Sequence, residues 1–337
     1  MNILIVIFSR NNKILQIDQA LEGMGFRVSV VYTDDYWYHC SYIKKKMDQL
    51  GVGKGRSCFE ASWKKDFYDK VKSFHPEIIF CVNLPAHILS VSDIENLSHL
   101  SRVFCWFVDG IHDNPEYIPY FSFIEKIAVF ELQDVEYLRK HNVENPCYVP
   151  IGYSKAYGMV GDAKSRNIDI SFIGSPLRHR LKILERIAEE AGHNGWNMRI
   201  YGPFYESRYF WKKYVLWIKY PNIFRCLRNG YVTTEQAANI YVQSKIALNI
   251  HDTRHSSPNP RTFDILAAGT LEISDVRQNY VDGLLPVKAY VVYENLDDLI
   301  EKLHYYLKNE LEREKIARYG KENNIYSMEY SLRMIFG

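Results

Sequence analysis

Short apolar runs alternate with helix-period segments along this chain, and this alternation restricts the fold more than any other feature. Each run is long enough for one strand, and the segments between runs carry apolar residues at helical spacing. Strands joined through helices predict a parallel sheet with helices on both faces. In the first half of the chain the strand-like runs are residues 2–8, 27–32, 77–82, 102–107, 126–130 and 147–149.

The same alternation starts again in the second half. Pro150, Gly152 and a loop of small and polar residues from 154 to 167 separate the two series, which is a composition typical of a linker. We therefore expect an α/β protein of two tandem Rossmann-like, doubly wound domains, spanning residues 1–155 and 165–320. In the second domain the strand-like runs are residues 168–173, 197–201, 245–250, 270–274 and 289–293.

The charge balance and the cysteines restrict partners and location. The chain has 42 Lys and Arg against 40 Asp and Glu, so no overall basic field indicates nucleic acid as a partner. Its six cysteines include no C-x-x-C pair, and its start, MNILIVIF, lacks a basic leader, which favours a cytoplasmic protein. No stretch approaches 18 apolar residues, so we expect no spanning helix, while attachment to the inner membrane surface stays open.

Several chemistries lack their sequence signatures. The chain has no G-x-x-x-x-G-K-[ST] loop, no G-x-G-x-x-G after the first strand, and no Cys/His cluster with metal-ligand spacing. These absences argue against a P-loop kinase, an NAD-dependent enzyme and a zinc site.

A glycine turn follows the first strand of the second domain. Ligands of doubly wound sheets bind beyond the carboxyl ends of the strands, so residues in such turns are the informative ones. Gly174 and Ser175 allow close backbone approach, and the next helix offers free N–H groups to an anion, with Arg178 and Arg180 adding charge. The alternative is an ordinary connecting turn.

A second strand end has a more specific pattern. Asn259 is a predicted N-cap and Pro260 the first helical residue, so the first N–H groups of that helix point toward a ligand. Arg261 beside this positive helix end is suited to hold a diphosphate. Asp264, one turn later, either accepts hydrogen bonds from ribose hydroxyls or is a solvated carboxylate that favours the helix dipole.

The segment NPRTFDILAAGTLEISD (259–275) resembles the C-terminal donor-binding domain of GT-B glycosyltransferases, specifically the CgeB-like branch of the group 1 (GT4-like) enzymes. DISFIGSPLRHR (169–180), MRIYGP (198–203) and KIALNIHD (245–252) stand in the expected order. VFCWFVDG (103–110) and the strand at Asn2 resemble the N-terminal domain of the same family. The likeness therefore covers nearly the whole chain.

The resemblance implies a nucleoside-diphosphate-sugar donor, bound mainly by the second domain beside an interdomain cleft. It also implies that residues 321–337 cross back to the first domain. Many retaining relatives carry two glutamates that border the donor; Ser256 and Asp264 stand at those positions here, so retention or inversion stays open. The donor-binding residues that the resemblance implies are Gly174, Ser175, Arg178, Tyr201, Gly202, Asn249, His251, Asn259, Arg261, Thr262 and Asp264.

No metal and no cofactor besides the donor substrate are expected. The D-x-D motif that anchors Mg²⁺ or Mn²⁺ in the other large transferase fold is missing, so helix N-termini and arginines take the metal's role. The expected acceptor is a hydroxyl of a glycan or of a lipid-linked glycan in the assembly of a surface polysaccharide.

The acceptor side of the reaction needs a base from the first domain. The strand at 102–107 ends in Val108-Asp109-Gly110-Ile111-His112, so either Asp109 or His112 is placed to remove the acceptor proton. The alternative is that Asp109 caps a turn and His112 lies on the surface.

Residues 204–231 mix aromatic and basic side chains, a composition found at membrane interfaces. This segment either rests on an anionic membrane or forms a packed helix with a solvated basic edge, and the interruption at Pro221 favours the second interpretation.

Two rival functions remain at this stage. One is a catalytically silent protein that binds nucleotide sugars and acts as a scaffold; the other is a hydrolase or epimerase on the same fold. Product analysis separates these functions from sugar transfer.

Overall fold

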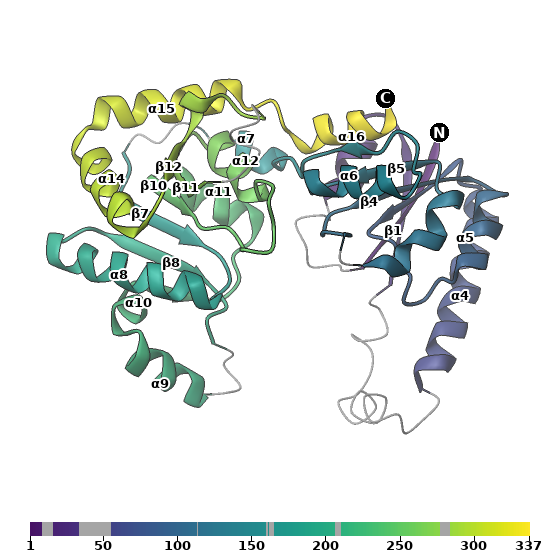
Figure 1. The fold of residues 1–337 in the computed structure, drawn as a ribbon, viewed down its shortest axis with the longest axis horizontal. Coiled ribbons are helices and arrows are strands. Elements are labelled where there is room, and N and C mark those ends of the chain that lie inside the picture. Colours follow the sequence, from purple (N-terminus) through teal and green to yellow (C-terminus); the bar gives the residue numbers. More distant parts are fainter. Residues whose placement is uncertain are drawn as a thin grey trace. The chain divides into compact units, whose positions relative to one another are not determined.

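The computed structural model describes residues 1–8, 16–33, 55–112, 114–159, 161, 165–205, 210–276 and 284–337. By its internal contacts the chain divides into two units. Unit 1 comprises residues 1–151 together with 328–337, and unit 2 comprises residues 152–327 (Figure 1). None of the helices in the described ranges is long and apolar enough to cross a bilayer.

Unit 1 is built on a parallel sheet in the order β2-β1-β3-β4-β5-β6. Its strands are β1 (Asn2–Ile7), β2 (Arg27–Tyr32), β3 (Ile78–Val82), β4 (Arg102–Phe107), β5 (Lys126–Val129) and β6 (Cys147–Tyr148). Its helices are α1 (Gln16–Gly23), α4 (Gly55–Phe74), α5 (Val91–Ser98), the 3-10 helix η2 (Pro115–Phe123), α6 (Leu132–Lys140) and α16 (Met328–Phe336).

The central strands of unit 1, β1, β3 and β4, are mainly apolar because the sheet is covered on both faces, whereas the edge strand β2 is only half-buried. Along β1, Leu4 and Val6 pack into one core, while Ile3, Ile5 and Ile7 pack into the other. This alternation follows from the period of two in a strand, with helices over each face.

Helix α16 belongs to unit 1 although it follows all of unit 2 in the sequence. Met328, Leu332 and Ile335 lie in the same core as Ile3 and Ile5. The Ser331 hydroxyl donates a hydrogen bond of 2.7 Å to the Pro150 carbonyl. The last helix therefore completes one face of the first sheet.

Unit 2 repeats the design with a parallel sheet in the order β12-β11-β10-β7-β8-β9. Its strands are β7 (Ile168–Ile173), β8 (Met198–Gly202), β9 (Leu227–Asn229), β10 (Ser244–Asn249), β11 (Leu271–Asp275) and β12 (Val291–Tyr293). Its helices are α7 (Lys155–Gly158), α8 (Arg178–Asn194), α9 (Phe210–Lys219), α10 (Pro221–Cys226), α11 (Thr234–Val242), α12 (Pro260–Ala267), the 3-10 helix η3 (Val287–Ala289), α14 (Leu296–Lys308) and α15 (Glu310–Asn323).

These two parallel sheets confirm the predicted fold class of two doubly wound α/β units. The segment expected to link the domains, residues 154–167, differs from the prediction in its described part. It lies within unit 2 and contains α7, which Ser154 caps by accepting a hydrogen bond from the Ala156 N–H. Tyr157 of α7 is buried, so its aromatic ring holds this short helix in place. Residues 160 and 162–164 of the expected linker lie outside the described ranges.

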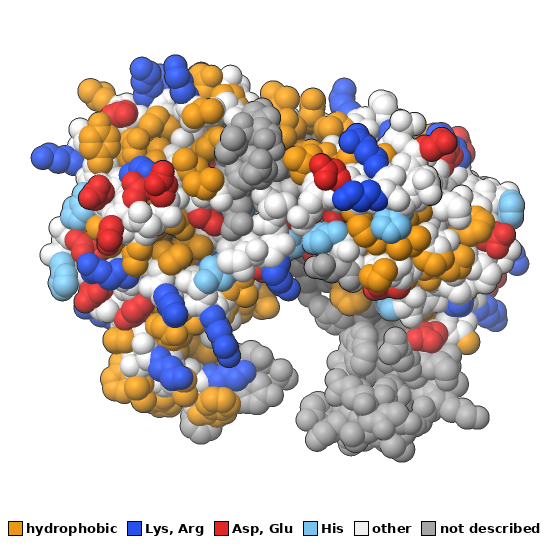
Figure 2. Space-filling model, viewed as in Figure 1, with side chains coloured by type: hydrophobic (Ala, Val, Ile, Leu, Met, Phe, Trp, Pro, Cys, Tyr) orange, Lys and Arg blue, Asp and Glu red, His pale blue; other side chains and the backbone are white. Residues whose placement is uncertain are grey.

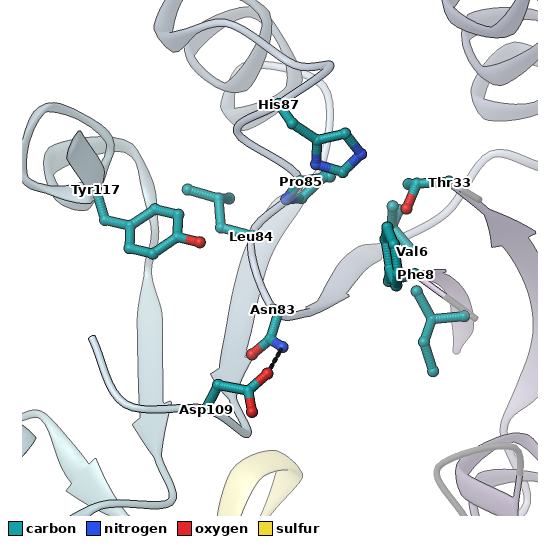
Figure 3. A pocket seen from close by; sticks show the side chains of 10 residues that line it. Val6, Phe8, Thr33, Asn83, Leu84, Pro85, His87, Asp109 and Tyr117 are labelled. Carbon is teal, nitrogen blue, oxygen red and sulfur yellow. Dashed lines mark hydrogen bonds between the residues drawn. The ribbon is translucent and has the colours of Figure 1, made fainter. Parts of the chain in front are cut away.

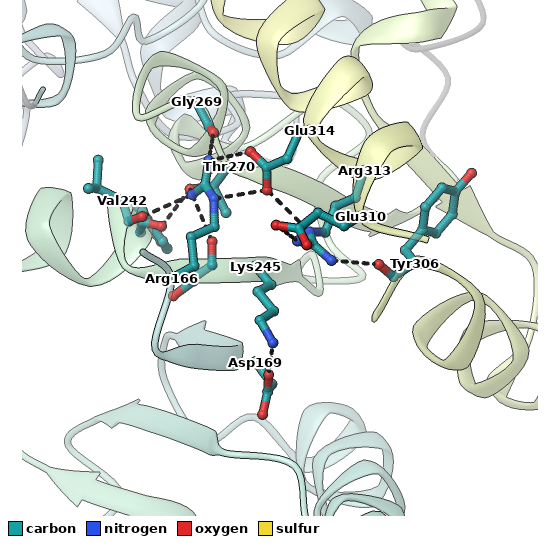
Figure 4. Close-up of polar contacts among 12 residues, drawn as sticks. Arg166, Asp169, Val242, Lys245, Gly269, Thr270, Tyr306, Glu310, Arg313 and Glu314 are labelled. Atoms are coloured by element: carbon teal, nitrogen blue, oxygen red, sulfur yellow. Dashed lines mark hydrogen bonds and ion pairs between the residues drawn. The ribbon is translucent and has the colours of Figure 1, made fainter. Parts of the chain in front are cut away.

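Arg166 joins several parts of unit 2 at one end of its sheet (Figure 4). Its guanidinium donates to the carbonyl oxygens of Val242 and Ser244 at 2.9 Å each and of Gly269 at 2.6 Å. It also forms a two-point ion pair with Glu314 of α15, with both N–O distances 3.1 Å. Only 15% of the Arg166 side chain is exposed. This one side chain therefore satisfies three carbonyls and fixes α15.

We expect Arg166→Ala to lower the free energy of unfolding of unit 2 by about 2–3 kcal/mol, because three carbonyls lose their donor and Glu314 loses its partner. Glu314 is 34% exposed, so water compensates part of the loss. Urea unfolding followed by circular dichroism measures the change. Arg186→Ala is the control, since Arg186 is 45% exposed and its ion pairs within the described residues are with Glu189 and Glu190 of its own helix. Equal effects of the two substitutions would refute this role for Arg166.

Candidate functional site

The topology of unit 2 fixes where a ligand crevice opens. Strand β7 has β8 on one side and β10 on the other, so the chain leaves β7 and β10 in opposite directions across the sheet. The loops after two such strands diverge, and ligands of doubly wound folds bind between them. Gly174 follows β7, and Asn249 ends β10. The predicted donor residues therefore gather around a topological switch point.

Two glycines bring the ends of β7 and β8 into close contact. The Gly174 N–H donates to the Tyr201 carbonyl at 2.9 Å. Gly202 has φ +152°, and a Cβ there would collide with the Gly174 carbonyl oxygen. A Cβ at Gly174 would lie 2.8 Å from the Phe172 ring. Neither position has room for a side chain, so this turn offers backbone to a ligand.

The start of α8 is exposed beside this glycine turn. Ser175 and Arg178 are exposed, and no side chain caps the first turn of the helix. Arg180, expected to add charge for an anion, instead is 5% exposed and donates to the Ile250 carbonyl at 2.8 Å and the Ser175 carbonyl at 3.3 Å. Arg180 therefore ties the two loops of the crevice together, and Arg178 is the arginine at this turn that faces solvent.

Helix α12 begins as the sequence predicts. Asn259 is the N-cap, and its side-chain oxygen accepts a hydrogen bond of 2.9 Å from the Arg261 N–H. Pro260 occupies the first turn, and Arg261 is half-buried beside it. A capped helix start with an arginine in its first turn is an arrangement that binds anions.

A buried polar cluster holds this helix start against β10. The Asn249 amide donates to Glu272 Oε1 at 2.7 Å, to Thr262 Oγ1 at 3.0 Å and to Asn259 Oδ1 at 3.1 Å. Asn259 returns a hydrogen bond of 2.8 Å to Asn249 Oδ1, and Thr262 donates to Glu272 at 3.0 Å. Glu272 and Thr262 are fully buried. The cluster fixes the cap residue, which rigidly orients the N-terminus of α12.

Glu272 has no role in the sequence prediction, and the structure supplies one. Its carboxylate is the shared acceptor for Asn249 and Thr262. Its charge also acts on a neighbour: burial first, and then Glu272, raises the pKa of Tyr290 to about 12.

His251 is buried and is held in place by hydrogen bonds. It is 1% exposed, and its Nδ1 lies 2.7 Å from Asp275 Oδ1, which also accepts from the His251 N–H at 3.0 Å. His179 Nε2 lies 2.8 Å from the His251 carbonyl. These contacts connect the loop after β10 to β11 and α8.

Asp264 lies beneath the first turn of α12. It is 2% exposed, so the interpretation as a solvated first-turn carboxylate is wrong. Burial first, and then the Asp264 charge and a side-chain hydrogen bond with Asp264, raise the pKa of the Tyr157 hydroxyl. Asp264 therefore anchors α7 to α12, and its contact with ribose stays a prediction.

Unit 1 has its own switch point, between β1 and β3, and a cavity of about 230 Å³ opens there (Figure 3). Its lining combines apolar, aromatic and polar groups from the ends of four strands and the loops that follow. Phe8 and His87 form an edge-to-face pair with ring centroids 5.9 Å apart. The lining residues are Val6, Ile7, Phe8, Thr33, Asn83, Leu84, Pro85, His87, Asp109 and Tyr117.

Asp109 is exposed and lines this cavity. The Asn83 amide donates to Asp109 Oδ2 at 2.8 Å, while Asn83 Oδ1 accepts from the Val108 N–H at 2.8 Å. Asn83 adopts φ +56°, a conformation that is uncommon for residues other than glycine and that clusters at functional sites. Asn83 thus orients the carboxylate of Asp109, and the sequence prediction missed it.

His112 is held by a carboxylate that the prediction also missed. Its Nδ1 lies 2.7 Å from Oδ1 of Asp134, which is fully buried and accepts from the backbone N–H groups of Ile111 and His112. Burial raises the pKa of Asp134 more than the hydrogen bonds from Ile111 and His112 lower it. The amide of Gln133 lies 3.1 Å from His112 Nε2. His112 is not among the residues that line the cavity.

The predicted site residues therefore fall into two groups. Asp109 and His112 belong to unit 1, and the predicted donor residues belong to unit 2. Within the described parts of the chain, no three His, Cys, Asp or Glu residues are grouped so that they could hold a metal ion. Metal independence stays a prediction.

Comparisons with known proteins agree with this geometry. Residues 178–335 match the family model described as "Glycosyl transferase-like". The spore protein CgeB of Bacillus subtilis (strain 168) is 26% identical over 206 residues, which are 57% of this chain. The alignment spans 60% of CgeB, less than two thirds of that protein.

Two solved structures share the fold over nearly the whole chain. A glycosyltransferase from Rickettsia africae ESF-5 superposes with a TM-score of 0.68 at 14% identity, covering 99% of this chain and 96% of that one. Anabaena HepE in complex with UDP gives a TM-score of 0.64 at 9% identity, covering 100% and 98%. The resemblance to CgeB-like group 1 glycosyltransferases of the GT-B fold is confirmed.

Proposed function

Since this chain is a relative of the CgeB-like group 1 glycosyltransferases, we propose that it transfers a sugar from a nucleoside diphosphate to a hydroxyl of a glycan or lipid-linked glycan. The observation that carries the proposal is the start of α12: a capped helix N-terminus with Arg261 in its first turn, at the switch point of a doubly wound sheet. We place the reaction in the cytoplasm, in assembly of a surface polysaccharide.

The diphosphate of the donor binds where accessible backbone and basic side chains lie close together. The positive N-terminal end of α12, Arg261 and Arg178 neutralise its charge, and the glycine turn at Gly174 and Gly202 lets the nucleotide approach the backbone. The same groups stabilise the nucleoside diphosphate as it departs, so the reaction needs no metal ion. HepE, which shares the fold, was crystallised with UDP, and this supports a nucleotide at such a site.

The acceptor hydroxyl enters the cavity of unit 1. Asp109, oriented by Asn83, accepts the hydroxyl proton while the acceptor oxygen bonds to the anomeric carbon of the sugar. The bond between that carbon and the diphosphate oxygen breaks, and its electron pair leaves with the nucleoside diphosphate. The aromatic pair of Phe8 and His87 offers apolar surface to a sugar ring.

Thermal stability against a panel of nucleoside diphosphates and nucleotide sugars, without metal, tests the donor site. A ligand present at about 100 times its Kd adds about 2.7 kcal/mol to unfolding, which raises Tm by about 5 °C or more. We expect one nucleotide to stabilise the protein selectively. Arg261→Ala is expected to weaken its binding about 10- to 100-fold, because a charged hydrogen-bond donor is lost.

Arg186→Ala again serves as the control and should keep the full shift, since it lies on the exposed face of α8. The proposal fails if no nucleotide changes the Tm of the folded protein. If a nucleotide sugar does bind, product analysis separates transfer from the rivals: a scaffold binds the donor and releases nothing, whereas an epimerase or hydrolase yields an isomerised donor or free sugar without an acceptor.

A further inference from the structure

Helix α9 presents its apolar face to solvent. Trp211, Tyr214, Val215 and Ile218 are spaced i, i+3, i+4 and i+7 and therefore share one side of the helix. Their exposed fractions are 53%, 57%, 40% and 71%. An apolar stripe with this spacing normally faces a protein core. Leu216, on the other side of α9, is the residue that packs into the core of unit 2.

Lys212 and Lys219 lie beside the apolar stripe, whereas Lys213 lies on the side of the helix that carries Leu216. Lys213 and Lys219 are exposed, and Lys213 Nζ lies 5.9 Å from the centre of the Phe224 ring of α10. No acidic residue occurs from 210 to 231. Figure 2 shows hydrophobic and basic side chains together at the end of unit 2 that carries α9. Helix α9 is thus packed on the side of Leu216 and has solvated lysines, but its exposed surface also carries the apolar stripe. Residues 206–209 of the predicted segment lie outside the described ranges.

The support beneath α9 is firm. The Glu185 carboxylate of α8 accepts from the N–H groups of Asn222 at 3.1 Å and Ile223 at 2.9 Å, which caps α10. Ile223 is fully buried in the same core as Leu216. The apolar stripe is thus held outward by packed neighbours.

We propose that α9 docks unit 2 on an anionic membrane surface, with its tryptophan and tyrosine stripe in the headgroup region and its lysines on the lipid phosphates. Tryptophan and tyrosine favour this region because they combine an apolar ring with a polar group. Flanking lysines reach the anionic surface while their stems lie along apolar atoms. The occupant must be both apolar and negatively charged, which a bilayer of anionic lipids provides over the whole length of the helix. This inference does not depend on the proposed reaction.

Sedimentation with lipid vesicles tests the proposal. The full chain should bind vesicles containing phosphatidylglycerol and bind pure phosphatidylcholine vesicles at least tenfold more weakly. Trp211→Ser with Ile218→Ser should lower the partition coefficient at least tenfold, because the inserted apolar area is lost. Lys212→Glu with Lys219→Glu should remove the preference for phosphatidylglycerol and its dependence on salt.

Val287→Ser with Leu311→Ser is the matched control, since these residues are 77% and 90% exposed and lie outside α9. This control should bind vesicles like the unaltered chain, and all variants should keep its Tm within a few degrees. Two results would overturn the proposal. One is equal vesicle binding by the α9 variant and the unaltered chain. The other is absence of vesicle binding together with a dimer, seen by ultracentrifugation, that the α9 substitutions disperse.

Discussion

Asp109→Asn is expected to lower the turnover of the donor about 10³-fold while leaving donor binding unchanged. Asparagine keeps the shape of the side chain and still accepts the hydrogen bond from Asn83, so the cavity stays intact. It cannot take a proton from the attacking hydroxyl. Since the acceptor is unidentified, the assay follows release of nucleoside diphosphate with a panel of glycan and lipid-linked glycan acceptors, relative to the release without an acceptor. The nucleotide sugar is the one that raises Tm most.

His112 provides the comparison, because it is the other group that the sequence places at this strand end. His112→Gln should lower the turnover of the donor less than about tenfold, since His112 does not line the cavity and is held against Asp134. The reverse order, a large loss at His112 and a small one at Asp109, would assign the base to the His112–Asp134 pair. Unchanged turnover in both variants would remove this cavity from the reaction.

Gly202→Ala is expected to lower the free energy of unfolding of unit 2 by about 3 kcal/mol and to abolish the thermal shift with nucleotide. Its Cβ would collide with the backbone carbonyl of Gly174, which no side-chain rotation relieves. The positive φ adds strain for any residue with a Cβ. When the backbone moves to relieve the collision and the strain, β7 and β8 separate at the predicted donor site. Urea unfolding and the nucleotide panel measure the two effects.

Gly195 distinguishes the collision from the backbone strain. It ends α8 with φ +68°, and nothing lies within 4 Å of the position its Cβ would take. Gly195→Ala should therefore cost only about 1 kcal/mol and leave the nucleotide shift unchanged. If both alanine variants lower the free energy of unfolding equally, the close approach of Gly202 to Gly174 contributes nothing to the effect of Gly202→Ala.

The fold was predictable because its signals are local. The central strands β3 and β10 are almost completely buried, so they appear in the sequence as mainly apolar runs. The start of α12 was predictable for the same reason, since Asn259 and Pro260 act within one turn. Element ends shifted by one or two residues where strands meet turns.

The polar partners were not predictable because they are distant in the sequence. Glu272 contacts Asn249 although their positions in the sequence differ by 23, and the positions of Asp134 and His112 differ by 22. Composition and periodicity carry no record of which side chains meet across neighbouring strands. For Arg180 the sequence predicted a ligand contact that the structure does not support. Its place in the glycine turn suggested a contact with an anion, but its guanidinium donates to two backbone carbonyls instead.

The position of α16 has a consequence for how the chain is made. Residues 2–7 and 78–82 leave the ribosome early, yet the helix that covers one face of their sheet is translated only after unit 2. Until then the surface that receives Met328, Leu332 and Ile335 is exposed for the whole synthesis of unit 2. Unit 2 is contiguous and can fold as it emerges, whereas the first sheet must wait until residues 328–336 have emerged. Nascent chains stalled before residue 328 should therefore need chaperones at the first sheet.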